Sequence, residues 1–394
     1  MNVVTSDRVR PSVVAETATT SGALRVALAG GGTGGHILPG RYLLEHAHAN
    51  RRVADVVWFQ TGRPVEDRAM AGLAEHLAPI ALERVALPLE PEGGGAPSLG
   101  RLGVLTLPAA RRARVALKRH RAEVLVGLGG FTTLPAALAA RSLGIPIVLV
   151  EINAAAGRAT RWLAPFSARV AHAWRATLAH GEDAKHHWIG PPLAERFQHG
   201  APSELETRAA ADSLGFDPDR PLVVVLGGSQ GALGLNRFVA AHAAFFSANG
   251  VQVLHQTGPG RAREGAGSAL EGYRAIEYVD DVQRVLAAAT FVLCRGGAST
   301  LAEVGALARP ACVVPYPHSP DHHQELNARE LGIGVRVVHE PGLDAAFARE
   351  LVRLVGPAGE RERSAMSAAL AVALPRDGVA RLWTEIESLA RSST

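Results

Sequence analysis

Three glycine-rich segments, each directly after an apolar run, carry the residues best suited to hold phosphate. The first is Gly30–His36 (GGGTGGH), which follows the apolar run Leu24–Ala29. Glycines let a backbone approach an anion closely, and a helix that follows presents free N–H groups at its N-terminus. We therefore expect a phosphate or diphosphate here, since a tight turn without a ligand needs fewer glycines.

The first segment also matches the spacing G-x-G-x-x-G through Gly30, Gly32 and Gly35. In dinucleotide-binding enzymes that spacing is joined by an acidic residue at the end of the second strand, which holds a ribose. Here the second apolar run ends in Phe59 and Gln60, and Asp55 lies near its start. An NAD(P)-dependent oxidoreductase is therefore the weaker alternative.

The second and third segments have the same build. Gly227–Ala232 (GGSQGA) follows the run PLVVVL, and Ser229 could cap the next helix or hold a diphosphate with the neighbouring N–H groups. The third segment is Arg295–Glu303 (RGGASTLAE). Ser299 is a candidate for its helix N-cap, and Glu303 is either a solvated first-turn carboxylate or the acceptor of two ribose hydroxyls.

The polar segment His318–Gln324 (HSPDHHQ) is either a metal site or an irregular loop that contacts a ligand. The neighbouring Pro317 and the internal Pro320 favour the loop, and we predict no metal and no other cofactor. Cys294 and Cys312 lie in apolar runs without a partner motif, so we expect them to be small buried side chains.

Apolar runs and helical patterns alternate along the chain. Strands are expected at Leu24–Ala29, Val53–Phe59, Glu123–Leu128, Ile145–Val150, Pro221–Leu226, Val251–Gln256, Phe291–Cys294 and Ala311–Pro315, and helices at Pro39–Ala49, Leu134–Leu143, Leu233–Phe246 and Gly378–Arg391. This alternation predicts an α/β fold with two doubly wound, Rossmann-like parallel sheets. Such sheets bind ligands at the carboxyl ends of their strands, which here face a common cleft.

We expect four regions along the chain. Residues 1–22 form a flexible extension, 23–192 a first Rossmann-like domain, 193–375 a second, and 376–394 a helix that packs back on the first domain. A length of 394 residues with 47% hydrophobic side chains is enough for two cores. The 42 glycines show no period, which excludes collagen-like and low-complexity chains.

Charge and hydropathy limit the partners. The net charge is +4, aromatic residues make up 5%, and no basic patch is interleaved with aromatics, so we predict no nucleic-acid partner. The sequence contains no run of 18 or more uncharged apolar residues, so we expect no membrane span. The N-terminal region lacks the apolar core of a signal peptide. Leu99–Arg121 mixes apolar and basic residues, which fits contact with an anionic membrane surface or a solvated surface helix.

Taken together, eight segments resemble the MurG family, which is glycosyltransferase family 28. They are GGGTGGHILPG (30–40), GLGGF (127–131), SLGIPIVLVEINAAAGRATRWLA (142–164), VVLGGSQGALGLN (224–236), HQTGPG (255–260), YVDDV (278–282), CRGGASTLAEVGALARPACVVPYPH (294–318) and HQELNA (323–328). They run in family order over about 24–390.

The resemblance implies a metal-independent, inverting enzyme of the GT-B fold with no cofactor. The family transfers N-acetylglucosamine from UDP-N-acetylglucosamine to the MurNAc 4-hydroxyl of lipid I, the undecaprenyl-pyrophosphoryl-MurNAc-pentapeptide. The product is lipid II of peptidoglycan synthesis, and the family works peripherally at the cytoplasmic face of the cell membrane. A related GT-B enzyme acting on another lipid or small-molecule acceptor is the alternative.

The resemblance also implies a set of site residues. Donor contacts are expected at Thr33, Gly34, Gly35, Asn153, Ser229, Val279, Ala298, Ser299, Thr300, Leu301, Ala302, Glu303 and Gln324, with Gly32, Glu151, Arg196, Gln230, Gly231 and His323 as further candidates. Within this set Ser229 matches a diphosphate contact, the Val279 backbone a uracil contact, Glu303 the ribose contact, and Gln324 a contact to hydroxyls of the GlcNAc ring.

His36 is our candidate general base, because a neutral imidazole near pH 7 suits proton removal from an acceptor hydroxyl. The other interpretation of His36 is a hydrogen bond to phosphate or a helix cap. Glu151 is a second base candidate or a structural carboxylate.

The chain departs from the family pattern at several places. Ala194 stands where the family has arginine, and Arg196 two residues later is a candidate replacement. The family's HEQN reads VEIN at 150–153, and its GGYVSGPGG reads GGFTTLPAA at 129–137. We expect side chains at Leu134–Ala137 to restrict the close approach of a phosphate, which leaves the acceptor open.

Overall fold

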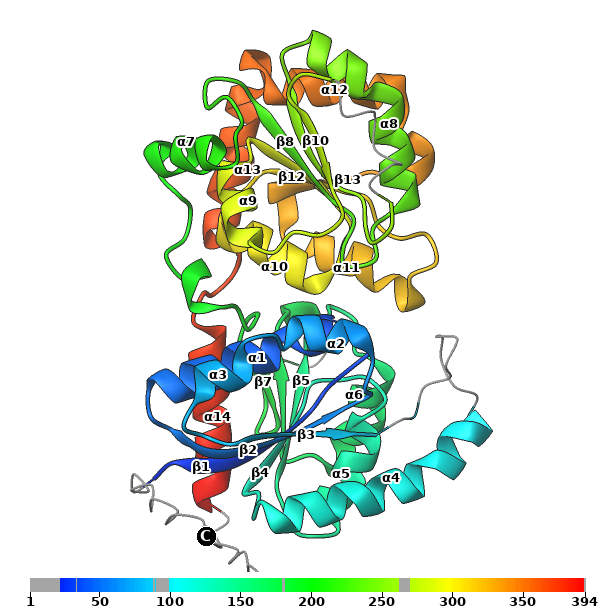
Figure 1. Cartoon of the computed structure of the whole chain (residues 1–394), viewed down its shortest axis with the longest axis vertical. Helices are drawn as coiled ribbons and strands as arrows, with labels where there is room; N and C mark the ends of the chain where they lie inside the picture. Colours follow the sequence, from blue (N-terminus) through cyan, green and yellow to red (C-terminus); the bar gives the residue numbers. More distant parts are fainter. Residues whose placement is uncertain are drawn as a thin grey trace, which may run out of the picture.

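The computed structural model of the chain describes residues 22–32, 34–87, 89, 99–178, 181–261 and 270–392. Thr33 and all but the last residue of the expected N-terminal extension lie outside these ranges. The chain forms two α/β domains, one above the other in Figure 1, with a C-terminal helix that runs along the first.

A seven-stranded parallel sheet of order β3-β2-β1-β4-β5-β6-β7 forms the first domain. Its strands are β1 Leu24–Ala29, β2 Val53–Gln60, β3 Leu82–Ala86, β4 Val124–Gly127, β5 Ile147–Glu151, β6 Arg169–His172 and β7 His186–Trp188. Its helices are α1 Leu38–Ala49, α2 Pro64–Ala69, α3 Leu73–Leu77, α4 Leu99–Arg119, α5 Thr133–Arg141 and α6 Arg158–Leu163, with short 3-10 turns η1 Gly34–His36, η2 Ala164–Phe166 and η3 Arg175–Thr177.

Successive side chains of β1 point to opposite faces of the sheet, and helices cover both faces. Val26 and Leu28 belong to a core cluster shared with α1 and α14, whereas Ala27 and Ala29 belong to a cluster shared with α4 and α5. The strand order reverses direction between β1 and β4. The loops after these two strands therefore meet at the carboxyl edge of the sheet, where such sheets bind ligands.

The second domain repeats this plan with a six-stranded parallel sheet of order β10-β9-β8-β11-β12-β13. Its strands are β8 Leu222–Leu226, β9 Gln252–Gln256, β10 Tyr273–Ile276, β11 Phe291–Cys294, β12 Ala311–Val313 and β13 Val335–Val337. Its helices are α7 Glu204–Ser213, α8 Leu233–Ala248, α9 Val282–Ala288, α10 Ala298–Ala306, α11 His323–Arg329, α12 Ala345–Val355 and α13 Glu360–Ala373, with 3-10 turns η4 Glu195–Phe197, η6 Pro320–His322, η7 Gly332–Gly334, η8 Glu340–Gly342 and η9 Pro357–Gly359. The order reverses between β8 and β11, which brings the second and third glycine segments together.

The two domains are held together by the chain that crosses between them. α14 (Gly378–Ser392) lies against α1 and β4 of the first domain (Figure 1), with Trp383 fully buried. One apolar core cluster continues from the first domain through Phe197 into the second. An added Cβ at Gly378 would meet the Pro191 carbonyl oxygen at 2.4 Å, so glycine permits the two segments that cross between the domains to touch.

The predicted doubly wound α/β fold is confirmed, and each expected strand and helix is present within a few residues of its expected ends. Five strands were not predicted: β3, β6, β7, β10 and β13. Four of these five are the edges of the two sheets. Edge strands are half-solvated and need no continuous apolar run, so sequences such as LERVA and HHW give no strand signal.

Candidate active site

A cleft of about 730 Å³ separates the two domains at the carboxyl edges of both sheets. The predicted residues that line it are Gly34, Gly35, His36, Asn153, Ser229, Gln230, Val279, Ala298, Ser299, Thr300, Glu303, His323 and Gln324. The first glycine segment therefore faces the second and third segments across the gap, although it is far from them in the sequence.

His36 ends the 3-10 turn η1 and is held by backbone. Its Nδ1 lies 3.2 Å from the carbonyl oxygen of Gly31, which can only accept a hydrogen bond. Nδ1 therefore carries the proton, and the lone pair is on Nε2. Burial lowers the pKa of the imidazole below its usual 6.5, against smaller opposing effects of the Gly31 hydrogen bond and the Glu151 carboxylate. His36 is thus neutral at pH 7, with its lone pair on the nitrogen that is not tied to Gly31.

The loop after β4 packs on the His36 ring. An added Cβ at Gly129 would lie 3.1 Å from Cδ2 of His36 and 3.2 Å from Nε2, so glycine is required for this contact. The backbone at Gly129 and Gly130 is also left-handed, with φ of 95° and 76°. These glycines therefore serve to seat the imidazole.

Asn153, at the first-domain wall of the cleft, is tied to the second domain by the fully buried Asn327 of α11. Asn327 accepts a hydrogen bond from the Ala154 amide (2.7 Å) and donates to the Asn153 side-chain oxygen (3.3 Å) and to the Gly296 carbonyl (3.0 Å). The asparagine side chain therefore joins the two walls directly behind the cleft. Sequence reasoning did not single out this residue.

Glu151 is a structural carboxylate in this arrangement. Its two oxygens accept hydrogen bonds from the amides of Asn153 (3.0 Å) and Gly157 (2.8 Å) and from the Thr160 hydroxyl (2.6 Å). The side chain is buried and does not line the cleft. These bonds order the chain between β5 and α6, and they occupy the oxygens that a base would need.

The segment Gly227–Ala232 forms the turn between β8 and α8, and the side chain of Gln256 holds it by two hydrogen bonds. The Gln256 carboxamide accepts from the Gly227 amide (3.1 Å) and donates to the Gly228 carbonyl (2.7 Å). The alternative role of Ser229 as a helix cap is wrong, because the N-cap is Ala232 and no side chain caps it. Ser229 and Gln230 are exposed at the cleft, beside the uncapped N-terminus of a 16-residue helix.

Glu303 lies in α10, which begins at Ala298 after the N-cap Gly297. The prediction of Ser299 as N-cap is wrong, since Ser299 is inside the first turn. The solvated alternative for Glu303 is also wrong: the side chain is 6% exposed, and burial raises its pKa from 4.5 to about 7 against the opposing field of Arg196. A buried carboxyl without a cation in contact is suited to accept hydrogen bonds from ligand hydroxyls.

Gln324 sits where η6 runs into α11, after two left-handed residues, Asp321 (φ 53°) and His322 (φ 51°). Its side-chain oxygen accepts from the amides of Tyr316 (2.9 Å) and Gly296 (3.2 Å). The amide NH₂ of Gln324 is thereby the donor left for a ligand, and the residue lines the cleft together with its neighbour His323.

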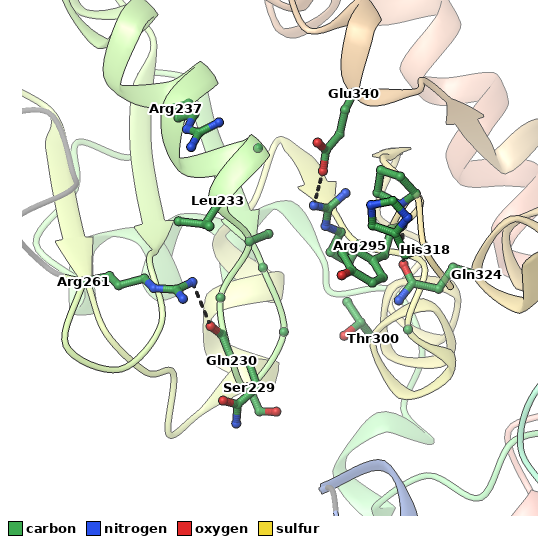
Figure 2. A pocket seen from close by; sticks show the side chains of 18 residues that line it. Ser229, Gln230, Leu233, Arg237, Arg261, Arg295, Thr300, His318, Gln324 and Glu340 are labelled. Carbon is green, nitrogen blue, oxygen red and sulfur yellow. Dashed lines mark hydrogen bonds and ion pairs between the residues drawn. The ribbon is translucent and has the colours of Figure 1, made fainter. Parts of the chain in front are cut away.

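A second hollow of about 640 Å³ adjoins the cleft and shares with it the wall made by Gly228, Ser229, Gln230, Gly297, Thr300 and Gln324. Figure 2 shows Arg237 and Arg261 on one side of this hollow and Arg295, Glu340 and His318 on the other. Arg261 donates to the Gln230 carbonyl (3.3 Å), and Arg295 is paired with Glu340. Gly231 also lines this hollow rather than the cleft.

The other predicted positions lie elsewhere. Leu301 and Ala302 are in the core of the second domain, with 0% and 2% exposure, so their side chains are not available to a ligand. The Gly32 amide is already bonded to Glu66 (2.7 Å). Ala194 is buried, whereas Arg196 is exposed and is the charge that acts on Glu303.

The altered segment at 129–137 is part helix, and the expectation that it restricts an acceptor phosphate stays a prediction. Residues from Thr133 on belong to α5, and Ala136 and Ala137 pack in the core against α4. None of the residues 129–137 lines the cleft. The side chains at Leu134–Ala137 therefore affect packing of the first domain and do not close off the cleft.

The cleft is also lined by Arg68, which no sequence motif had pointed to. Arg68 of α2 lies with its guanidinium 4.8 Å from the ring centre of Tyr278, a cation–π contact across the mouth of the cleft.

Asp55, the only acidic residue in β2, is bonded to His120 (2.5 Å), so it does not serve the dinucleotide alternative.

In the part of the chain that the structure describes, no cluster of three or more His, Cys, Asp or Glu side chains is arranged to hold a metal ion. Over the same ranges, no helix is both long and apolar enough to cross a membrane. Cys294 and Cys312 are free and fully buried, as predicted.

Comparison with known proteins gives consistent matches. The model of the glycosyltransferase family 28 N-terminal domain matches residues 26–172, and that of the C-terminal domain matches residues 222–335. The UDP-N-acetylglucosamine–N-acetylmuramyl-(pentapeptide) pyrophosphoryl-undecaprenol N-acetylglucosamine transferase of Paenarthrobacter aurescens is 40% identical over 80% of this chain and 82% of its own length. The protein of that name from a Nocardioides species is 37% identical over 94% of this chain and 100% of its own.

Among solved structures, MurG of Acinetobacter baumannii superposes with a TM-score of 0.66 at 21% identity, covering 93% of this chain and 99% of its own. The calicheamicin glycosyltransferase CalG4 reaches 0.64 at 17% identity, covering 93% and 98%. At these identities the superpositions show a shared fold.

Proposed function

The chain belongs to glycosyltransferase family 28, and we propose that its cleft transfers N-acetylglucosamine from UDP-N-acetylglucosamine to the 4-hydroxyl of lipid-linked N-acetylmuramyl-pentapeptide. The observation that carries this proposal is the convergence, on one cleft, of two uncapped helix N-termini, a buried carboxyl and a neutral histidine. Relatives covering most of this chain bear the name of that transferase.

The second domain supplies the donor site in this proposal. The diphosphate lies at the N-termini of α8 and α10, whose free N–H groups and dipoles favour anions. Ser229 donates to a phosphate oxygen, and Arg237 and Arg261 add positive charge beside the same wall. Glu303 accepts hydrogen bonds from the ribose hydroxyls, the Val279 backbone contacts the base, and the Gln324 amide donates to hydroxyls of the sugar.

The first domain supplies the acceptor side and the base. The acceptor hydroxyl loses its proton to Nε2 of His36, and its oxygen attacks the anomeric carbon from the face opposite the leaving group. The bond from that carbon to the diphosphate oxygen breaks, UDP departs, and the configuration is inverted. Proton transfer of this kind contributes roughly 100- to 10,000-fold. The helix N-termini stabilise the negative charge that develops on the diphosphate.

UDP release tests this function directly. We expect UDP to form from UDP-N-acetylglucosamine only when a lipid I analogue is present, and His36→Ala to lower kcat by at least about 100-fold with donor affinity retained. Donor binding without UDP release for any acceptor would indicate a sugar-nucleotide binder. A fluorescence response to NADH and none to UDP would favour an oxidoreductase.

A lipid-linked acceptor suggests where the protein meets the membrane. Several large apolar side chains of α4, α5, α6 and η2 are exposed: Leu107 (65% exposed), Val115 (65%), Leu138 (44%), Trp162 (46%) and Phe166 (61%). Helices α4, α5 and α6 lie on the side of the first domain away from α14 in Figure 1. Exposed Arg111, Arg112, Lys118 and Arg119 lie on α4 among them. We propose that this face docks on the anionic cytoplasmic surface of the cell membrane.

Sedimentation with anionic vesicles tests the membrane face. We expect salt-sensitive binding that falls strongly in a Trp162→Ser/Phe166→Ser variant, since buried aromatic area and basic charge act together. Leu205→Ser on α7 is the control, because Leu205 is an apolar side chain on the other domain that is more exposed (78%) than Trp162 or Phe166. Unchanged vesicle binding by the double variant would refute this face.

A further inference from the structure

Glu66 is a fully buried carboxylate in α2, outside the cleft, that sequence reasoning did not single out. It accepts five hydrogen bonds. Oε1 receives the amides of Gly32 (2.7 Å) and Thr61 (3.0 Å) and the Thr61 hydroxyl (2.6 Å), and Oε2 receives the amides of Gly62 (2.7 Å) and Arg63 (3.1 Å). A buried negative charge is tolerated only when it is bonded in this way.

These bonds exceed what the start of a helix requires. A capping-box glutamate bonds back to the N-cap residue alone, as Glu206 of α7 does to the amide and hydroxyl of Ser203 (both 2.8 Å). Glu66 makes the corresponding bond to Arg63 and then reaches Gly32, 34 residues earlier in the chain. Its remaining function is therefore to hold the first glycine segment against the turn after β2.

The glycine segment links Glu66 to His36. An added Cβ at Gly31 would lie 2.4 Å from Oε1 of Glu66, so the carboxylate packs directly on the Gly31 backbone. The carbonyl of that residue accepts the hydrogen bond from Nδ1 of His36 (3.2 Å). From the other side, an added Cβ at Gly130 would lie 2.9 Å from the Gly31 oxygen and 3.2 Å from Nδ1. The hydrogen bond is thus enclosed between Glu66 and Gly130.

We propose that Glu66 is a positioning residue for the transfer, which acts through the Gly31 carbonyl on the orientation and tautomer of His36. By fixing Gly31 and Gly32, the carboxylate keeps the carbonyl aimed at Nδ1, so that the lone pair stays on Nε2. The proposal rests on the proposed function, because it assigns to His36 the role of base. Misplacing a reacting group by about 1 Å costs on the order of 100-fold in rate.

Glu66→Gln is the first test. Glutamine keeps the shape, but its NH₂ group cannot accept, so two or three of the five donors lose their partner. We expect kcat to fall by about 100-fold. The KM for UDP-N-acetylglucosamine should change less than kcat, because Ser229, Glu303 and Gln324 all lie in the other domain. Glu206→Gln, at the corresponding position of α7, is the matched control and should keep wild-type kcat.

A double-variant cycle separates positioning from general stability. We expect Glu66→Gln to cause no further loss of kcat in a His36→Ala background, since the group through which it acts is gone. Losses that multiply in the double variant, or wild-type kcat of Glu66→Gln alone, would overturn the positioning role. Wild-type turnover of His36→Ala alone would instead overturn the base of the proposed function.

Thr61→Val is a second test of the positioning role of Glu66, for use if the Glu66→Gln variant does not fold. It removes only the hydroxyl that donates to Oε1 (2.6 Å) and leaves the four amide bonds in place. We expect a smaller fall in kcat that likewise disappears in the His36→Ala background. A loss of the same size with and without His36 would refute the positioning role.

Discussion

Glu303→Gln should make the ligand-free protein more stable and a poorer binder of the donor. The side chain is 6% exposed, and its pKa is raised from 4.5 to about 7 by burial. At about 1.4 kcal/mol for each factor of ten in proton affinity, this rise corresponds to about 3 kcal/mol. That free energy is the cost of keeping an ionised carboxylate in the apolar wall of α10, and glutamine does not incur it.

The sign of the pH dependence follows from the raised pKa. Between pH 4.5 and about 7 the folded protein binds more protons at Glu303 than the unfolded chain does, so wild-type stability falls as the pH rises through this window. The difference in free energy of unfolding between Glu303→Gln and wild type should be near zero at pH 4.5. It should grow to about 3 kcal/mol at pH 8.

Donor affinity should change in the opposite direction. Hydrogen bonds to an ionised acceptor contribute about 1 kcal/mol more than those to a neutral amide, so we expect the variant to bind UDP-N-acetylglucosamine at least about fivefold more weakly at pH 8. Wild-type affinity should itself weaken as the pH falls below about 7, whereas the affinity of the variant should be flat.

Urea unfolding at pH 5 and pH 8, with calorimetric titration of the donor, measures both effects. Glu204→Gln, an exposed glutamate on α7, is the control and should change the free energy of unfolding by less than about 0.5 kcal/mol at either pH. A stability difference that is the same at both pH values, or unchanged donor affinity in Glu303→Gln, would refute the reasoning.

Three further predictions test the walls of the cleft. Because burial lowers the pKa of His36, the acid limb of kcat, measured at saturating donor so that protonation of Glu303 does not act through binding, should have its midpoint below pH 6.5. A midpoint above that value would exclude His36 as the base. Gly231→Ala should reduce donor affinity and lower the melting temperature, since its Cβ would lie 2.1 Å from the Thr257 carbonyl at φ 70°; wild-type binding and melting would contradict this. Asn327→Ala leaves the buried Ala154 amide and Gly296 carbonyl without their partner and should lower the free energy of unfolding by about 1–3 kcal/mol in urea, whereas no change would show that the domain link is unimportant.

Periodicity and glycine placement in the sequence predicted most of the fold. Central strands such as Leu24–Ala29 and Phe291–Cys294 are buried on both faces, so their apolar runs match the structure residue for residue. The edge strands β3, β7, β10 and β13 were missed because one side of each faces solvent. Local patterns cannot reveal such strands, which form only because a neighbouring strand is already in place.

The parts of the site that depend on local backbone conformation could be predicted from the sequence. The parts that depend on contacts between distant residues could not. The glycine segments and their order identified the cleft. The charge of Arg196 that acts on Glu303 and the bond from the Ala154 amide to Asn327 each join residues more than 100 positions apart, and no spacing rule reports them. Glu66 had a partial signal, since proline at the first and glutamate at the third helical position is a capping pattern. The hydrogen bond between Glu66 and Gly32 had no signal in the sequence.

The product of the reaction tests the central claim most directly. The protein is incubated with UDP-N-acetylglucosamine and a soluble lipid I analogue, and the isolated product is analysed by mass spectrometry and by NMR of the new anomeric centre. We expect one added N-acetylglucosamine on the 4-hydroxyl of the muramyl residue, joined with inverted, β configuration. Unmodified acceptor, or a product that retains the α configuration of the donor, would contradict the proposed single displacement.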